Sequence, residues 1–265
     1  MGKSEGKERT TYGAGDRRNR WNSLNVHTRG RLDWVGFQGC RMTIAYPSHD
    51  STDCAVNADT IKYHLVRWLL DGGMGFQKEQ DAIGNEVLFS SKWRRADLLL
   101  LSDRFHALEV KSDVDSLSRL KEQLADYHQV FDKVSVVTTA KQLRGVQKAV
   151  TAKTGVIVVD NGQPRIVRQA RITRRLNRNE LSRFINRATL TTLLESNKRG
   201  MSTDELRQQA ATAFPIRDVR RVAYDILRQR YIRLFRLFLC DIGPTNIFGQ
   251  DDLRSLCGKV DVITL

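Results

Sequence analysis

Two carboxylates and a lysine are the residues of this sequence whose types and spacing best fit chemistry. Asp97 lies in an apolar stretch, and 12 residues later Glu109 begins the triplet Glu109-Val110-Lys111 that closes a second apolar stretch. If the two stretches are neighbouring strands of a hairpin, Asp97 and Glu109 project to the same face. Paired carboxylates repel one another unless a cation lies between them, and a hard divalent cation takes such oxygen ligands. A metal site is therefore one hypothesis, and a pair of surface acids is the alternative.

Lys111 returns to the face of Glu109, because side chains alternate along a strand. Its ammonium group could there orient an attacking water and offset the charge of a phosphate group. The triplet has little meaning by itself, since a second one, Glu5-Gly6-Lys7, lies in the polar N-terminal segment. Only the triplet that contains Lys111 closes an apolar strand and follows an acid-bearing strand.

Helices and short strands must position these residues. Apolar side chains at helical spacing predict a helix from Ala58 to Leu70, and three β-like stretches follow it: Asn85–Phe89, Arg95–Leu101 and Phe105–Val110. Further along, the patterns predict helices over 117–131 and 142–152 and strands over 134–138 and 156–159, with a turn at Asp160-Asn161-Gly162. The order α-β-β-β-α-β-α-β describes a mixed sheet flanked by helices, an α/β fold over residues 57–164.

This pattern resembles the PD-(D/E)XK nuclease superfamily, whose core has the order αβββαβ. The matching segments are Arg94-Arg95-Ala96-Asp97, Ala107-Leu108-Glu109-Val110-Lys111 and Gln123-Leu124-Ala125-Asp126-Tyr127. The last segment fits the Q-x-x-x-Y element of one branch, the overall pattern is closest to bacterial and phage members, and Ala96 replaces the proline of the name. The resemblance implies a restriction-endonuclease-like core and a magnesium-dependent nuclease in which manganese substitutes for magnesium. It also implies that Asp97, Glu109 and the Val110 carbonyl bind the metal and that Lys111 positions the water.

Three further residues are candidates for supporting roles at this site. Glu86 is the extra upstream acid that many members of the superfamily carry, and the alternative is a charge at a strand edge. Gln123 and Tyr127 lie at i and i+4 on one helical face and could approach the site together. Their alternative is a core tyrosine beside an exposed glutamine.

The positive charge of the chain is unevenly distributed. The formal net charge is +14; residues 1–41 carry nine basic and four acidic groups, and residues 165–200 carry ten and two. Excess charge beside a nearly neutral middle predicts a polyanionic partner, with nucleic acid as the leading candidate and DNA favoured over RNA. Arg94 and Arg95, next to Asp97, are candidate contacts to it. The alternative is a solvated basic surface.

The segments outside the core have different characters. Residues 1–41 show no hydrophobic period and are expected to be a disordered basic segment, with Met42 as a candidate start. Residues 165–178 are expected to be a basic linker, and residues 179–265 a helical module of helix-turn-helix or winged type. Its nucleic-acid-binding residues would be Arg217, Arg220 and Arg221, and a wing would begin within Tyr231 to Leu239. A helical cap on the core is the alternative for this module.

Several function classes are excluded by composition. No apolar run reaches the ~18 residues that a membrane helix needs, so no membrane partner is expected. The four cysteines lie far apart without a C-x-x-C pair, which argues against a zinc ribbon or disulfide framework and favours a cytoplasmic protein. The leading function is a nuclease that hydrolyses phosphodiester bonds. The alternative is a non-catalytic nucleic-acid-binding protein or regulator that uses a degenerate nuclease fold as scaffold, and the sequence leaves a homodimer open.

Overall fold

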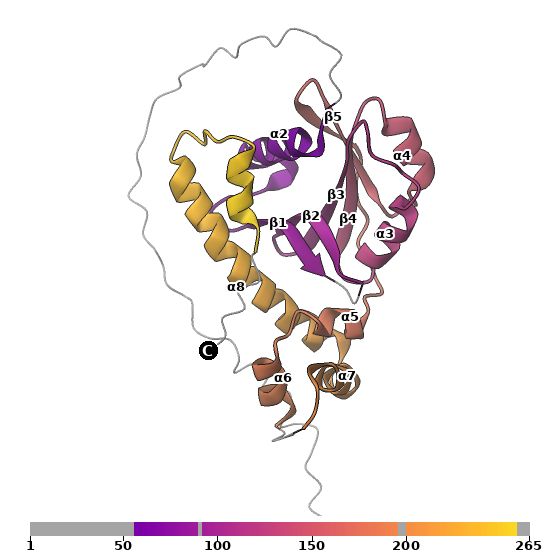
Figure 1. The fold of residues 1–265 in the computed structure, drawn as a ribbon, viewed down its shortest axis with the longest axis vertical. Helices are drawn as coiled ribbons and strands as arrows, with labels where there is room; N and C mark the ends of the chain where they lie inside the picture. Colours follow the sequence, from indigo (N-terminus) through magenta and orange to yellow (C-terminus); the bar gives the residue numbers. More distant parts are fainter. Residues whose placement is uncertain (1–55, 90–91, 196–199, 259–265) are drawn as a thin grey trace, which may run out of the picture. The chain divides into compact units, whose positions relative to one another are not determined.

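A computed structural model describes residues 56–89, 92–195 and 200–258 of the 265-residue chain. The chain divides into the units Met1–Asp53 and Cys54–Leu265. The first unit lies outside the described residues, and with it lie the basic segment 1–41 and the candidate start Met42. The second unit contains the sheet and all described helices (Figure 1).

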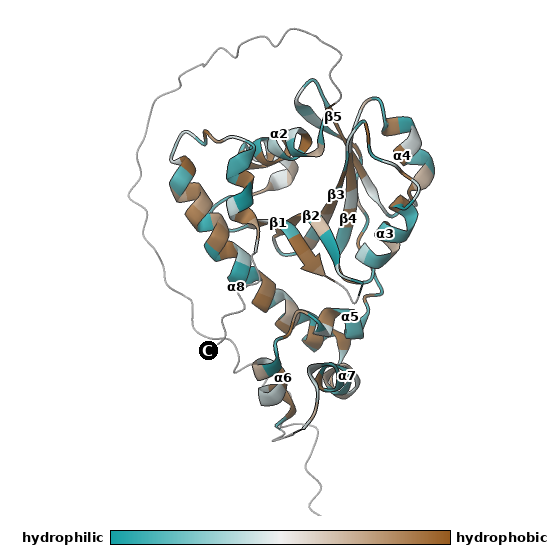
Figure 2. Cartoon of the chain, in the orientation of Figure 1, coloured by the Kyte–Doolittle hydropathy of each residue, from teal (hydrophilic) through white to brown (hydrophobic). Residues whose placement is uncertain are grey.

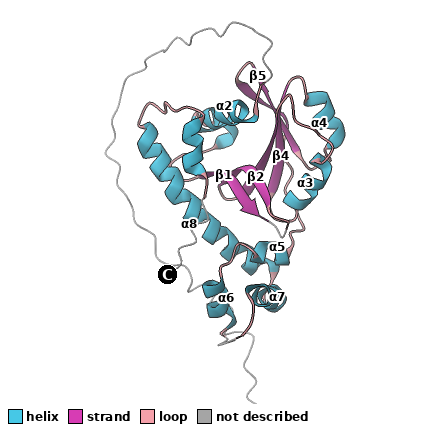
Figure 3. Cartoon of the chain, in the orientation of Figure 1, coloured by secondary structure: helices cyan, strands magenta, loops and turns pink. Residues whose placement is uncertain are grey.

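One mixed sheet of six strands forms the centre of the second unit (Figure 3). The strands lie in chain order: β1 (Ala82–Phe89), β2 (Arg94–Leu101), β3 (Phe105–Lys111), β4 (Lys133–Thr139), β5 (Gly155–Asp160) and β6 (Gln163–Arg168). The pairs β3–β4 and β4–β5 are parallel, and the other three pairs are antiparallel. β3, at the middle of the order, is buried along its whole length. The predicted α/β class is confirmed.

The last strand replaces the first part of the expected basic linker over residues 165–178. Asn161 and Gly162 have φ values of 47° and 73°, which are typical of a two-residue hairpin turn. This turn returns the chain antiparallel to β5, with Asp160 opposite Gln163. The linker prediction was wrong for Arg165 to Arg168, because an edge strand tolerates long polar side chains that a central strand would not.

Three helices flank the sheet. α2 (Ala58–Leu70) begins at Asn57, whose side chain accepts a hydrogen bond from the Thr60 amide, and it ends before the short helix η1 (Gly73–Gly75). It contacts strands β3 to β6. α3 (Leu120–Tyr127) contacts β2, and α4 (Leu143–Ala149) contacts β4 and β5. In Figure 1, α3 and α4 lie on one side of the sheet and α2 on the other.

The C-terminal part is mainly helical. It contains α5 (Arg178–Ser182), α6 (Arg187–Leu194), α7 (Thr203–Ala213), α8 (Ile216–Ile242) and η2 (Asp251–Leu256). α5 and α6 are separate helices, because Asn186 starts a new helix by accepting from the Thr189 amide. At the start of α7, Ser202 and Glu205 form a capping box.

α8 is continuous, and this overturns the expected wing at 231–239. Tyr231, Phe235 and Phe238 are buried at helical spacing and extend the apolar face that Val219 begins. Figure 2 shows apolar and polar residues alternating along this helix. α8 contacts β1, and the ring of Tyr224 stacks on Phe105 of β3 with centroids 3.9 Å apart. The helical C-terminal part therefore shares a core with the sheet.

No helix in the described ranges combines the length and apolar character needed to cross a membrane.

Candidate functional site

Three acids lie in one row across neighbouring strands. The β1–β2 register places Glu86 opposite Asp97, and the β2–β3 register, continued by one residue, places Asp97 opposite Glu109. The Val110 amide donates a hydrogen bond of 2.7 Å to Asp97 Oδ2. The sequence-based expectation that Asp97 and Glu109 lie close together on adjacent strands therefore agrees with this geometry. Glu86 has a φ of 52°, so β1 is locally irregular at this row.

Lys62 of α2 supplies a cation to this row. Its side chain is only 6% exposed, and Nζ forms an ion pair with Glu86 and lies 3.8 Å from Asp97 Oδ1. It also donates to Asn85 Oδ1 at 3.3 Å. Lys62 was not among the predicted site residues, although its place in the apolar pattern of α2 indicates a buried lysine. Lys62 belongs to the buried stripe of α2 together with Leu65, Val66 and Leu69, and a lysine in such a stripe needs a buried partner.

Glu109 is held from two directions. Lys111 Nζ lies 2.8 Å from Glu109 Oε1, and both side chains are buried. The Tyr127 hydroxyl donates to Glu109 Oε2, and its oxygen lies 2.8 Å from the Arg95 carbonyl oxygen. Tyr127 therefore contacts Glu109 from the end of α3, and its supporting role at a site together with Gln123 stays a prediction. Gln123 is half-buried and makes no side-chain hydrogen bond within the described residues.

Burial and the neighbouring charges shift the pKa values of the residues in this cluster. Burial raises the pKa of Asp97 to about 7, with a further contribution from Glu109 that Lys62 and the Val110 amide partly offset. Burial would lower the pKa of Lys62, but Asp97 and Glu86 outweigh it and raise that pKa. Burial and the charge of Glu109 raise the pKa of Tyr127 well above its usual value, so its hydroxyl stays a donor.

In this arrangement protein groups already contact the carboxylates that were predicted to bind a metal ion. Oxygen atoms of Asp97 and Glu109 that a hard cation would take are bound by an amide, a lysine and a tyrosine hydroxyl. No group of three or more histidine, cysteine, aspartate or glutamate side chains in the described ranges is arranged to hold a metal. The binding of magnesium or manganese by Asp97, Glu109 and the Val110 carbonyl stays a prediction.

The arginines predicted to contact nucleic acid have unequal surroundings. Arg94 Nε lies 3.0 Å from Asp126 Oδ2, and its Nη2 lies 2.5 Å from Glu122 Oε1, whereas Arg95 is exposed. Arg220 forms a two-point ion pair with Asp132 of the loop before β4. Arg217 is 81% exposed beside Asp218, and Arg221 is half-buried. Arg95 and Arg217 are thus the most exposed residues of this predicted set.

The fold and this cluster define an α/β protein in which two buried lysines contact a row of three acids. Residues 53–256 match the family described as bacteriophage P4 protein cII. Protein cII of Enterobacteria phage P4 is 29% identical over 205 residues, which are 74% of this chain and 76% of that protein. The chain belongs to the bacteriophage P4 protein cII family.

A solved structure also has some similarity to the chain. It is described as SPO1766 protein of unknown function from Silicibacter pomeroyi, is 17% identical, and covers 59% of this chain and 92% of that one with a TM-score of 0.34. A similarity at this level carries no argument about fold or function.

Family membership corrects the main functional predictions. The assignment to the PD-(D/E)XK nuclease superfamily was wrong, and so were the predicted magnesium-dependent nuclease activity and phosphodiester hydrolysis, because the family match places the chain elsewhere. The physical reason why the motif misled is visible in the structure. Asp97, Glu109 and Lys111 occupy the expected strands, but a short motif of common residues does not by itself define a catalytic site, and here Lys111 and Tyr127 bind Glu109.

Proposed function

We propose that this protein is a non-catalytic nucleic-acid-binding regulator that prefers DNA to RNA and uses its α/β core as scaffold. Membership of the bacteriophage P4 protein cII family supports this alternative over an enzyme. In this proposal the likeness of the core to restriction endonucleases concerns the scaffold alone. The acids of the core have no catalytic role in this proposal, and Lys62 and Lys111 form ion pairs with Glu86 and Glu109.

The observation that carries the proposal is the contrast between two groups of arginines. Arg94 and Arg220 are paired with acids. None of the six arginines between residues 165 and 178 forms an ion pair with an acidic side chain of the described residues. Five of the six are exposed: Arg165, Arg171, Arg174, Arg175 and Arg178. Unneutralised guanidinium groups at a surface are what attracts a phosphate backbone.

The proposal is tested by binding titrations at several salt concentrations. Labelled duplex DNA, single-stranded DNA and duplex RNA of equal length are titrated with the full chain, in chelator so that no metal takes part. We expect DNA to bind more tightly than RNA, with log K falling linearly as log salt rises. Absence of binding to any nucleic acid at low salt would refute the proposed function.

Regulation requires sequence recognition in addition to backbone affinity. Selection of bound fragments from a pool of random duplexes separates the two, because base-edge contacts enrich a motif and phosphate contacts do not. We expect enrichment of a motif. A palindromic motif would also indicate that the protein binds as a homodimer. An unenriched pool would leave a nucleic-acid-binding protein that is no sequence-specific regulator.

A further inference from the structure

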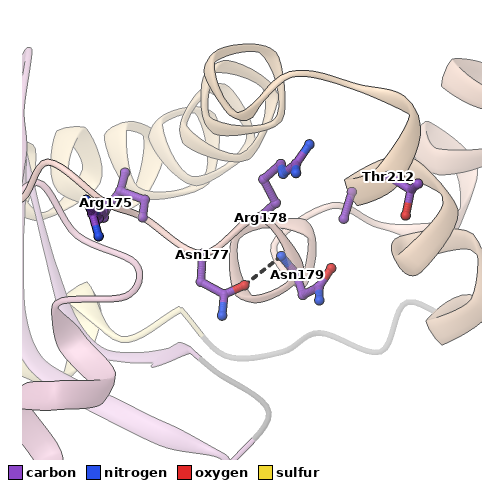
Figure 4. Close-up of a pocket in the computed structure, with 7 residues that line it drawn as sticks. Arg175, Asn177, Arg178, Asn179 and Thr212 are labelled. Atoms are coloured by element: carbon purple, nitrogen blue, oxygen red, sulfur yellow. Dashed lines mark hydrogen bonds between the residues drawn. The ribbon is translucent and has the colours of Figure 1, made fainter.

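An open groove lies between the segment that leads into α5 and the end of α7. Its volume is about 520 Å³, and residues 175–179 together with Ala211 and Thr212 line it (Figure 4). Arg175 comes from the segment, Arg178 is the first residue of α5, and Thr212 lies near the end of α7. This stretch covers the end of the predicted linker and the start of the predicted helical module, and none of the predicted site residues lies in it.

The polar groups of the groove suit an anion. No acidic residue is among those that line it, whereas two guanidinium groups and the side-chain amide of Asn179 are. The Thr212 hydroxyl donates to the Gln208 carbonyl and the Asn177 side chain donates to Gln129, so the two arginines supply most of the donors. Arg178 Nη1 donates to the Phe214 carbonyl at 3.2 Å, which fixes the guanidinium group against α7 and leaves its other donors for a ligand. The planar fork of arginine matches the oxygen atoms of a phosphate group.

The backbone around the groove is fixed before any ligand binds. The Asn177 side chain accepts from the amides of Asn179 and Glu180, and the Asn177 amide donates to the Gln129 carbonyl at 2.7 Å. These bonds tie the start of α5 to the loop after α3. A fixed frame lowers the entropy cost of ordering the arginines on binding.

Positive charge continues beyond the groove along the chain. Arg171 and Arg174 are exposed and form no ion pair with the described residues. A single small anion would contact only a part of this charge. A chain of consecutive phosphates would contact the groove and the preceding arginines together.

We propose that the groove between Arg175, Arg178 and Thr212 binds the phosphodiester backbone of nucleic acid. This inference rests on the proposed function and assigns its contact surface. The surface lies mainly on the segment before α5, whereas α8 supplies Arg220 to an internal ion pair.

The test compares two double variants in the same salt titration with a labelled DNA duplex. The groove variant is Arg175→Ala with Arg178→Ala. The control is Arg144→Ala with Arg254→Ala, which removes the same charge from exposed positions on α4 and η2. Each lost phosphate contact lowers the salt slope by about 0.9, so the groove variant should lose roughly 2 in slope and about tenfold in affinity. The control should keep the wild-type slope.

Two additional experiments test the groove independently of the double variant: a single charge-reversal variant and a titration with pyrophosphate. Arg175→Glu alone removes no hydrogen bond that holds the fold, so it tests the groove even if the double variant is unstable, and it should weaken binding more than Arg144→Glu. Inorganic pyrophosphate tests for a small-anion site. If the groove variants lose pyrophosphate binding and keep DNA affinity and slope, the backbone assignment is overturned while the proposed function stands. If wild-type protein binds no nucleic acid, both fail.

Discussion

Arg220 on α8 and Asp132 before β4 form a two-point ion pair: Nε and Nη2 of Arg220 lie 3.1 and 2.7 Å from the two carboxylate oxygens of Asp132. Asp132 is buried, and its Oδ2 also accepts the Phe105 amide at 3.0 Å. The guanidinium group of Arg220 lies 4.5 Å from the centre of the Tyr224 ring. The pair therefore fastens α8 to the end of the sheet where β3 begins.

Arg220→Ala should destabilise the protein strongly. The substitution leaves the carboxylate of Asp132 buried with its main cationic partner removed, which costs about 3 kcal/mol. Arg217→Ala, at an 81% exposed position one turn earlier, should change stability by less than about 0.5 kcal/mol. Urea unfolding followed by circular dichroism measures both. Equal stabilities of the two variants would contradict the structural role of Arg220.

Lys62→Met should make the melting temperature of the protein depend on a divalent cation. The substitution removes the buried ammonium group that faces Glu86 and Asp97, so their charges repel without compensation. We expect a lower melting temperature and a recovery of part of the loss on addition of magnesium, because a metal that binds only the folded state stabilises it. Lys148→Met, at an exposed position on α4, is the matched control. If magnesium shifts the melting temperature of Lys62→Met and of the wild type equally, Lys62 does not occupy a cation position.

Asp97 should make the stability of the protein fall as the pH rises. Its pKa is raised to about 7 in the folded protein, whereas an unfolded aspartate titrates near 4. Between these values the folded state holds a proton that the unfolded state has released, so the free energy of unfolding decreases with pH over this window. A pKa difference of about three units, at 1.36 kcal/mol per unit, gives an upper bound of about 4 kcal/mol for the loss in the free energy of unfolding. The loss is smaller than this bound because 25% of the Asp97 side chain is exposed to solvent.

The measurement for Asp97 is the difference between wild type and Asp97→Asn. Urea unfolding at a series of pH values gives both free energies, and the carboxylates that do not interact with Asp97 cancel in the difference. The stability of the wild type relative to the variant should fall from about pH 4 to about pH 7. A difference that stays constant or rises with pH would show that Asp97 is not the group with the raised pKa.

Gly162→Ala should weaken the β5–β6 hairpin. Gly162 has a φ of 73°, and a Cβ there would lie 2.7 Å from Cε1 of His64 on α2. Gly72→Ala is the matched control, because Gly72 also has a positive φ, 88°, but an added Cβ meets no atom within 4 Å. Both variants should lose about 1 kcal/mol in free energy of unfolding from backbone strain. Gly162→Ala should lose more, because its Cβ also clashes with His64. Hydrogen exchange of β6 amides should rise in that variant. A smaller loss than that of Gly72→Ala would contradict the contact.

The local patterns of the sequence determined most of the core. The helix Ala58–Leu70 was predicted with its observed bounds, and the first five strands were predicted to within a few residues at each end. These elements carry strong hydrophobic periodicity, which burial against the sheet enforces. The pair Asn161-Gly162 likewise determined its turn, because few other residues adopt the positive φ values that it needs.

Tertiary structure alone decided which charges meet. The sequence placed Asp97 and Glu109 on neighbouring strands, but their compensation depends on Lys62, which comes from a helix more than 30 residues earlier. The sequence likewise predicted Arg220 as a surface contact, whereas the packing of α8 on the sheet brings it to Asp132, 88 residues away in the chain. Hydrophobic periodicity predicts which face of an element is buried, but it does not predict which distant side chain that face contacts. The role of a charged residue depends on that partner, so motif spacing predicted a nuclease site where folding brings together a buried cluster of acids and lysines.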